Sequence, residues 1–533
     1  MEPSDVVKLD LELAWQRMKL DRPNRAFYTH PRLFEWIEHD LESWFASVKQ
    51  RLQDGYRPHP SLTCSVPKPG WLVRPGTVLD EQDELVFNAL VGSLYEKAYK
   101  SLGPFQGDPD IAYQLQPNAS AKEWIRTGYQ VWAEWRIKSC QKLNGAQFVV
   151  ISDIAGFYEN IDFQRLSSDL KPLCPDPTLL NLLMTLLNRW AQPRAKGIPQ
   201  GFSAGDILAK IYLNPIDRAL RNGGFIHLRY VDDFRIFYKS RLEAKRGLLL
   251  LNDLMRKRGL NLQSAKTKIL RTDEASREID GVTPLIEAIG TELATEMREN
   301  FFDVPSSITV SEIGRFFEEH PTAPMPEILE RAFHDNFGST VERFDKTLLH
   351  YLFTRLAKLK SKVAIGYAIE LLQQRPEETE FALRYLQEVG VSEADDDRVL
   401  DYISSSEAIY DYQIFQIVTW FLTKSSIPLR LLQLCRAWSA DKNRDLWLRT
   451  AARSVLGRAG DQSDLEAIEG SYDTIAGELE KADVVDALTR MEMSRRNSFF
   501  GRVSSDGELV SRAIRCVRAG ALRGNRELAS QRN

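Results

Sequence analysis

Two adjacent carboxylates stand in the middle of a strand-like stretch, His227–Tyr238 (HLRYVDDFRIFY). Aromatic and aliphatic residues alternate with other residues on both sides of the pair, which is typical of β-strands. Aspartate is a poor strand residue but a good turn residue. We therefore expect a β-hairpin whose turn carries Asp232 and Asp233. Considered by itself, the stretch is explained most simply by two acids that only form the turn.

A third acid, Asp153, follows the apolar run Phe148–Ile151, which has the pattern of a buried strand. An acid at a strand end can lie at the same sheet edge as an acid in a hairpin turn. Two negative charges about 4 Å apart repel by roughly 4 kcal/mol at an effective dielectric of about 20. A fold tolerates such a cluster only when protons or cations neutralise it. Considered alone, Asp153 would be a helix cap or a loop acid.

Oxygen ligands favour Mg²⁺, which keeps coordination positions for substrate phosphates. Two such ions stabilise the attacking and leaving oxygens of a phosphoryl displacement. The three acids therefore predict a nucleotidyl-transfer site.

Two further stretches bear on this prediction. Ala195–Asp217 begins with a Gly- and Pro-containing turn and continues into a helix with small residues, which lets backbone approach a bound nucleotide. Cys64–Tyr99 reads as a strand, a tight turn, a second strand and a helix, and it places Lys68 and Arg74 on a hairpin. For either cation alone, a solvated hairpin charge is the simpler interpretation.

In this order along the chain, the stretches resemble the motifs of reverse transcriptases. The resemblance covers residues 61–272 and comprises fingers motifs (VPKPGWLVRP), motif A (DIAGFYENI), motif B (GIPQGFSAGDILAKIYL), motif C (RYVDDFRIF) and motif D (RKRGLNLQSAKTKI). It implies an α+β fold with a right-hand polymerase palm and fingers, which we expect over residues 61–275.

The resemblance also assigns roles to the charged residues that match the motifs. It implies that Asp153 and Asp232 hold two Mg²⁺ ions, with Asp233 as a third, less critical acid. It implies that Lys68 and Arg74 contact the triphosphate of a deoxynucleotide.

Four more residues receive roles in the same way. Gln200 and Gly201 are expected to line the nucleotide pocket. Tyr158 stands where the family keeps an aromatic residue that blocks a ribose 2′-hydroxyl, and Lys266 matches a lysine that can donate a proton to the leaving pyrophosphate. A packed aromatic at a strand end is the simpler interpretation of Tyr158 and is compatible with the same role.

The pattern changes beyond residue 282, where amphipathic helical segments follow one another between short polar turns. The stretch LWLRTAARSVLGRAGDQSDLEAIEG reads as a helical-repeat unit. We expect an all-α, HEAT-like repeat domain over residues 285–520, although a non-repetitive helical bundle fits nearly as well. Residues 1–60 are expected to form an N-terminal helical segment.

A palm that is followed by a long helical array, without a clear thumb, resembles the bacterial abortive-infection (Abi) polymerases. This resemblance implies template-independent, protein-primed DNA synthesis from dNTPs in antiphage defence. It also implies a single-stranded DNA product attached to the protein and a trimeric or hexameric homo-oligomer. Protein priming requires a hydroxyl nucleophile, and Tyr28 is a surface candidate, although an ordinary tyrosine at a helix end is the simpler interpretation.

Three alternatives remain open on the sequence. One is a template-directed reverse transcriptase of the retron or group II intron type. A second is a nucleotide cyclase, which also uses paired acids but does not require the Pro-Gln-Gly helix start. A third is a helical scaffold with a vestigial palm, against which the intact acids argue.

Composition excludes several classes of protein and of site. With 70 Lys and Arg against 74 Asp and Glu, the net charge of −4 excludes a globally basic nucleic-acid binder and leaves only local basic surfaces. The five cysteines are scattered without a CxxC pair, which argues against a zinc site or a disulfide framework. No membrane-spanning run or basic leader is present, so we expect a cytoplasmic protein without a membrane partner.

Overall fold

The computed structural model describes residues 9–25, 27–300, 327–338 and 344–519. By their contacts, the residues form two compact units. The first comprises Met1–His30, Leu41–Thr63 and Gly76–Gly281, and the second comprises Pro31–Asp40, Cys64–Pro75 and Val282–Asn533. The predicted domains were continuous, whereas residues 31–40 and 64–75 group here with the C-terminal helices. The boundaries 1–60, 61–275 and 285–520 remain predictions, and residues 301–326, 339–343 and 520 of the last domain lie outside the described residues.

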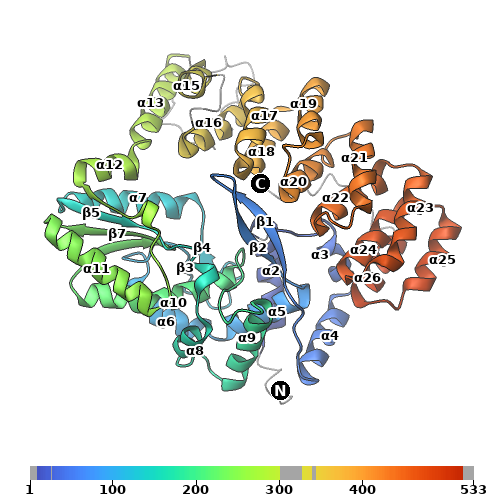
Figure 1. Cartoon of the computed structure of the whole chain (residues 1–533), viewed down its shortest axis with the longest axis horizontal. Coiled ribbons are helices and arrows are strands. Elements are labelled where there is room, and N and C mark those ends of the chain that lie inside the picture. The colour runs from blue at the N-terminus through green and yellow to red at the C-terminus, as the bar shows by residue number, and fades with distance from the viewer. Residues whose placement is uncertain (1–8, 26, 301–326, 339–343, 520–533) are drawn as a thin grey trace. The chain divides into compact units, whose positions relative to one another are not determined.

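The first unit is built around a four-stranded antiparallel sheet with the strand order β6-β7-β5-β8 (Figure 1). The strands are β5 (Phe148–Ser152), β6 (Ile226–Tyr230), β7 (Asp233–Tyr238) and β8 (Lys268–Arg271). Strands β6 and β7 form the expected hairpin, in which Tyr230 pairs with Asp233. Successive side chains of a strand point to opposite faces of the sheet, so each strand places apolar residues against the helices on both sides.

Helices cover both faces of this sheet. On one face, α7 (Tyr129–Leu143) and α12 (Thr272–Asp280) share an apolar core with Val149, Leu228 and Phe237 of the strands. The strand residues between these point to the other face, where they lie against α10 (Ser203–Asn222) and α11 (Arg241–Lys257). The sheet is therefore fixed from both sides, and its functional groups must lie at a strand end.

The helix α10 takes its N-terminal cap from a distant part of the chain. Asp21 lies on α2 (Leu11–Arg25), and its carboxylate accepts hydrogen bonds from the backbone N–H of Ser203 at 2.6 Å and from the Ser203 hydroxyl at 2.5 Å. A carboxylate at a helix N-terminus satisfies otherwise unpaired N–H groups and interacts favourably with the helix dipole. The N-terminal helix thus supports the element that carries motif B.

The remaining elements of the first unit surround this core. They are α4 (Leu41–Gln53), α5 (Glu81–Ser93), α6 (Tyr95–Leu102), α8 (Phe163–Leu170), α9 (Pro177–Trp190) and the short pair β3 (Gln114–Leu115) and β4 (Ile125–Arg126). The hairpin strands β1 (Leu62–Lys68) and β2 (Leu72–Val78) begin and end in this unit, but their central residues 64–75 belong to the second one.

Where the structure describes it, the second unit is helical apart from that hairpin segment. Its helices are α3 (Leu33–Glu38), α13 (Thr283–Asn300), α15 (Glu327–Phe337), α16 (Lys346–Lys358), α17 (Ile365–Gln374), α18 (Thr379–Val389), α19 (Glu393–Ser404), α20 (Asp411–Phe421), α21 (Leu429–Ala440), α22 (Leu446–Ala459), α23 (Gln462–Ser471), α24 (Glu478–Ala487), α25 (Met493–Val503) and α26 (Glu508–Arg518). The predicted helical C-terminal region is confirmed. Among the described residues, no helix is both long enough and apolar enough to cross a membrane.

Helices of this unit pack in two rows. From α16 to α26, each even-numbered helix contacts the next even-numbered one, and α17, α19, α21 and α23 form a second series. The two N-terminal segments join this array through specific contacts. Arg512 of α26 donates to the carbonyl oxygen of Asp40 at 2.7 Å, and the Tyr410 hydroxyl donates to the carbonyl oxygen of Trp71 at 2.9 Å.

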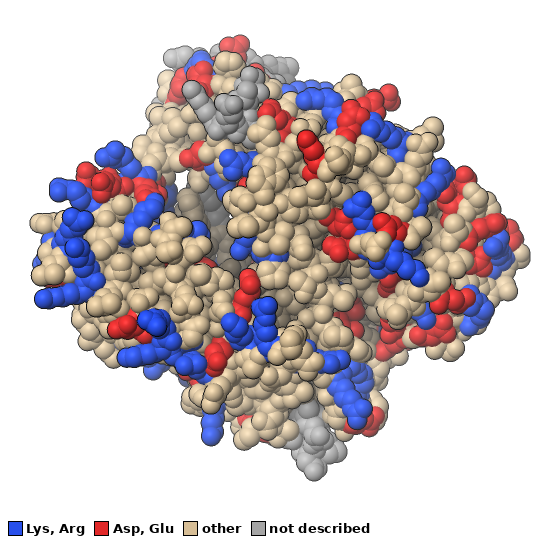
Figure 2. Space-filling model, in the orientation of Figure 1, with Lys and Arg blue, Asp and Glu red and all other residues tan. Residues whose placement is uncertain are grey.

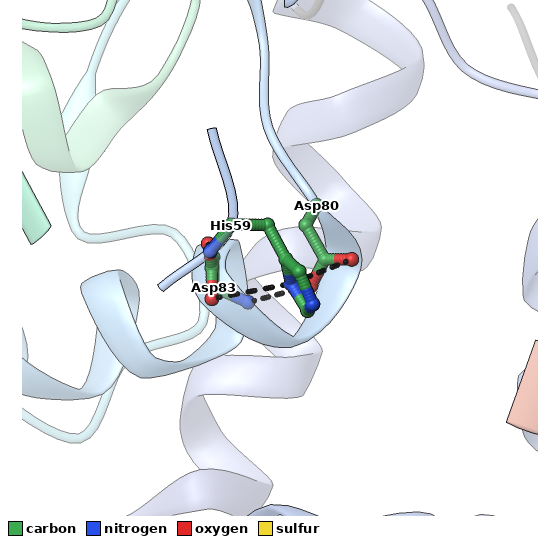
Figure 3. A group of neighbouring side chains, drawn as sticks. All are labelled: His59, Asp80 and Asp83. Atoms are coloured by element: carbon green, nitrogen blue, oxygen red, sulfur yellow. Dashed lines mark hydrogen bonds and ion pairs between the residues drawn. The ribbon is translucent and has the colours of Figure 1, made fainter. Parts of the chain in front are cut away.

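A histidine and two aspartates meet where α5 begins (Figure 3). Asp80 caps the helix by accepting from the backbone N–H of Gln82, and the Nδ1 atom of His59 lies 3.3 Å from an Asp80 oxygen and 3.9 Å from an Asp83 oxygen. Asp83 also accepts from the Tyr56 hydroxyl at 2.7 Å. Burial, followed by the Asp80 charge, raises the pKa of Asp83 to about 6. We interpret the group as an ion pair that closes a helix cap.

This ion pair predicts a pH-dependent contribution to stability. The hydrogen bond to Asp80 raises the pKa of His59 against the opposing effect of burial. Because the folded-state pKa is raised, the contribution is fully present below the unfolded pKa of about 6.5 and is lost as the pH rises through the folded value. His59→Gln should therefore lower the free energy of unfolding by about 0.5 kcal/mol at pH 5.5 and by less at pH 9, since the imidazole is 53 % exposed. Urea titrations measure both values, and the pH-dependent difference should vanish in an Asp80→Asn background.

Candidate active site

Three carboxylates converge at one end of the palm sheet. Strands β5 and β7 pair up to Ser152 and Phe234, so the next residues, Asp153 and Asp233, lie at the same end of the β5–β7 ladder. Asp232 occupies the turn between β6 and β7, next to Asp233. One oxygen from each of these carboxylates lies within 4.8 Å of the others. The predicted meeting of Asp153, Asp232 and Asp233 is confirmed.

The electrostatics of this cluster favour a cation. Burial, and then the charges of Asp232 and Asp153, raise the pKa of Asp233 to about 7. A carboxyl group with such a pKa binds a proton readily unless a metal ion replaces that proton. The donor set consists of carboxylate oxygens only, which suits Mg²⁺ better than a transition metal. The three residues therefore fit a divalent ion site of the kind that the sequence predicts.

Lys266 lies beside the cluster. Its Nζ atom is 3.1 Å from an Asp153 oxygen, and its side chain is 64 % exposed. Partial burial lowers the pKa of Lys266, but the hydrogen bond to Asp153 and the charges of the other acids outweigh it, so the net shift is upward. The lysine therefore carries a proton beside the cluster, as a proton donor to a leaving group must.

A buried ionic network holds the turn that carries Asp232. Val231 has a φ of +55°, a left-handed conformation that is costly for a β-branched residue. The Nη1 atom of Arg229 donates to the Val231 carbonyl oxygen at 2.8 Å. The same guanidinium bonds Asp217 at 2.6 Å and Asp110 at 2.8 Å. Arg229 therefore fixes the strained turn against α10 and the loop before β3.

The network continues to a second buried cation. Lys210 of α10 lies 2.5 Å from Asp110 and also donates to the carbonyl oxygen of Ala112 at 2.6 Å. His227 completes the other end, with Nε2 at 3.3 Å from Asp217. Sequence reasoning missed this network. The available signal was the presence of charged residues in stretches that are otherwise buried, namely Arg229 in a strand and Lys210 and Asp217 in a helix.

Motif B folds tightly against Tyr158. The Tyr158 hydroxyl donates to the Asp206 carboxylate in the first turn of α10, and the Tyr158 carbonyl oxygen accepts from Ile198 at 3.0 Å. Gly201 has a φ of +90°, and a Cβ atom at Gly205 would lie 2.6 Å from the Pro199 carbonyl oxygen. The turn therefore requires glycine at both positions. Gln200 is half-buried in the same turn.

Three further predicted residues belong to other elements of the chain. Lys68 ends β1 and is half-buried, while Arg74 is exposed on β2, and both belong to the second compact unit. Their contact with a triphosphate therefore remains a prediction. The expectation that Tyr28 lies at the surface is wrong, because its side chain is only 3 % exposed. A priming role of Tyr28 remains a prediction.

One comparison with known protein families finds a match. Residues 87–293 match the family described as "Reverse transcriptase (RNA-dependent DNA polymerase)". No curated protein sequence matches the chain.

Solved telomerase structures are among the similar folds. One from Candida albicans with a TWJ fragment of telomeric RNA is 12% identical, with 72% of this chain and 68% of that chain covered and a TM-score of 0.32. Apo telomerase from Candida tropicalis is 11% identical, with 67% and 68% covered and a TM-score of 0.29. The Candida tropicalis enzyme with a TWJ fragment is 12% identical, with 68% of each chain covered and a TM-score of 0.31.

Proposed function

We propose, from the premise that this chain carries a reverse transcriptase domain and is a nucleotidyltransferase of the RNA-directed DNA polymerase type, that it synthesises DNA from dNTPs without a template and from a protein primer. The observation that carries the catalytic part of this proposal is the convergence of Asp153, Asp232 and Asp233 within 4.8 Å. The proposed biological role is antiphage defence by abortive infection.

The residues of the site have distinct tasks in this proposal. Asp153 and Asp232 would hold two Mg²⁺ ions, and Asp233 would complete the oxygen ligands. When bound, the ions supply charge stabilisation at the attacking and leaving oxygens of the displacement. Lys266, whose Nζ atom lies 3.1 Å from an Asp153 oxygen, would give a proton to the departing pyrophosphate. Arg229 keeps the Asp232 turn in position through the Val231 carbonyl oxygen.

The architecture after the palm supports the template-independent part. In the described part of the chain, β8 is followed by α12 and α13 rather than by a hairpin and a small helical thumb that could cradle a duplex. The two-row packing of α16 to α26 supports HEAT-like repeats. The resemblance to Abi polymerases adds the covalently attached single-stranded product and the trimeric or hexameric assembly to the proposal. The cytoplasmic location that the sequence predicts is also part of it.

A reaction without nucleic acid tests the proposal. The purified full-length protein is incubated with dNTPs and Mg²⁺, and the products are analysed by denaturing electrophoresis and by intact mass. DNA that remains attached to the protein after heat and detergent is the expected result. Product that appears only with an RNA template would instead establish the template-directed alternative. A cyclic nucleotide would identify a cyclase, and a cellular effect that persists in Asp232→Asn would identify a scaffold.

Tyr158 provides a prediction on sugar selection. Tyr158→Val removes the ring that is proposed to exclude a ribose 2′-hydroxyl, so the preference for dNTPs over rNTPs should fall by about 10- to 100-fold. The ratio of kcat/KM values for dATP and ATP measures this preference. Tyr158→Phe is the matched control, because it keeps the ring and removes only the hydrogen bond to Asp206. Unchanged discrimination in the valine variant would assign the gate to another residue.

A further inference from the structure

The outer surface of α11 carries a concentration of positive charge. Six exposed cations lie on this helix and on the residue two positions before it: Lys239, Arg241, Lys245, Arg246, Arg256 and Lys257. We call this set the α11 basic face. Figure 2 shows Lys and Arg side chains gathered over this helix at the left of the view.

These cations are not neutralised by the surrounding protein. Among the described residues, none of their side chains makes an ion pair or a hydrogen bond, whereas Arg258 at the end of the same helix pairs with Asp169. Only two acids accompany them on the helix, and one of these, Glu243, is engaged in a capping box with Ser240. In a chain with a net charge of −4, this face forms a local positive field.

The helix is held rigidly against the sheet. Its inner face buries Ala244, Gly247, Leu251 and Met255. A Cβ atom at Gly247 would lie 1.7 Å from the Tyr238 hydroxyl oxygen, so the helix backbone approaches the sheet as closely as glycine allows. With 17 residues, the helix presents a track about 25 Å long. The cations are therefore displayed on a preformed support.

This track ends beside the catalytic edge. The Lys257 carbonyl oxygen accepts from the Arg165 side chain at 2.8 Å. A few residues later, the N–H of Gln263 donates to the Asp153 carbonyl oxygen at 2.7 Å. The C-terminal end of α11 is thus connected through a short loop to the residue that begins the metal site.

Two exposed leucines lie among the cations. Leu242 is 58 % exposed and Leu249 is 63 % exposed. Surfaces that bind single strands combine charges that follow the phosphate backbone with aromatic side chains on which unpaired bases stack. On the α11 basic face, the two leucines would offer such bases apolar contact without stacking. Duplex DNA would bury its bases and leave the leucines without a partner.

We propose that the α11 basic face binds the backbone of single-stranded DNA and guides the nascent strand away from the active site. The choice of DNA as the strand rests on the proposed function, whereas the charge of the surface does not. The phosphates are expected to contact Lys245, Arg246, Arg256 and Lys257, and the leucines are expected to contact bases or sugars.

Fluorescence anisotropy of the full-length protein with labelled (dT)20 tests the proposal. The variant K245Q/R246Q/R256Q/K257Q should weaken binding by at least 10-fold at about 50 mM KCl. The slope of log Kobs against log[KCl] should fall in magnitude by about 2 to 3, since each lost single-strand phosphate contact contributes about 0.7. The matched control K49Q/K97Q/K100Q/K171Q removes four exposed lysines of the same unit from α4, α6 and the end of α8. It should leave both quantities unchanged.

The outcomes separate this proposal from its alternatives. Equal affinity and slope in the α11 variant and the wild type would overturn it. Stronger α11-dependent binding of (rU)20, or equal competition by polyglutamate, would show that the occupant is RNA or an acidic protein. A changed oligomeric state in light scattering, with DNA binding retained, would make the face an interface between copies. Template-free synthesis without α11-dependent binding would refute only this inference, and binding without any synthesis would refute only the proposed function.

Discussion

Asp232→Asn is expected to abolish nucleotide incorporation, with a loss of at least about 1,000-fold in kcat, which corresponds to roughly 4 kcal/mol of lost transition-state stabilisation. The amide has the size of the carboxylate but cannot supply a charged oxygen to a metal ion. Asp153→Asn should have the same effect. Incorporation of a labelled dNTP at saturating Mg²⁺ measures the loss.

The same substitution should not destabilise the protein. The Asp232 charge is one of the causes that raise the pKa of Asp233 to about 7, so removing it relieves repulsion within the cluster. We expect a thermal midpoint equal to or above that of the wild type in metal-free buffer. Asp273→Asn, at an exposed site on α12, is the control for both measurements. A large drop in the thermal midpoint of Asp232→Asn would mean that the acid serves the fold instead of a metal site.

Arg229→Met is expected to have the largest effect on stability. Burial alone would raise the pKa of Asp217, but the Arg229 charge and the bonds from Arg229 and His227 hold that pKa below its usual range. Without the guanidinium, Asp217 and Asp110 lose the cation that bridges them in a fully buried site. Breaking a buried ion pair in this way costs about 3 to 5 kcal/mol. Urea denaturation measures the change in the free energy of unfolding.

Two further variants test whether the loss of stability in Arg229→Met comes from the broken ionic network. Arg229→Lys keeps the charge but cannot reach both carboxylates and the Val231 carbonyl oxygen, so an intermediate loss is expected. Arg256→Met removes an exposed arginine and should change stability by no more than about 0.5 kcal/mol. If Arg229→Met unfolds with the wild-type free energy, the network does not support the palm.

The sequence predicted the parts of the site that depend on local pattern. Alternation on either side of Asp232 and Asp233 indicated the hairpin, and the apolar run before Asp153 indicated the strand that pairs with it. Both are decided by residues within a few positions of one another. The roles predicted for Tyr158 and Gln200 came instead from the resemblance to reverse transcriptase motifs.

The parts that sequence reasoning missed depend on contacts between distant residues. Arg229 bonds Asp110 across more than a hundred positions, and no local pattern signals which buried acid accompanies which buried cation. Tyr28 reads as a surface residue in a polar stretch, yet tertiary packing buries it. The grouping of residues 64–75 with the helical array arises from contacts such as that between Tyr410 and Trp71, which are separated by 339 positions.

The cap that Asp21 provides for α10 has a practical meaning for fragment design. All the recognisable motifs lie between residues 61 and 272, so a fragment cut at these limits would contain every motif. Such a fragment would lack the carboxylate that anchors Ser203, 182 positions away, at the start of the helix that carries motif B. A minimal polymerase from this chain must therefore retain α2.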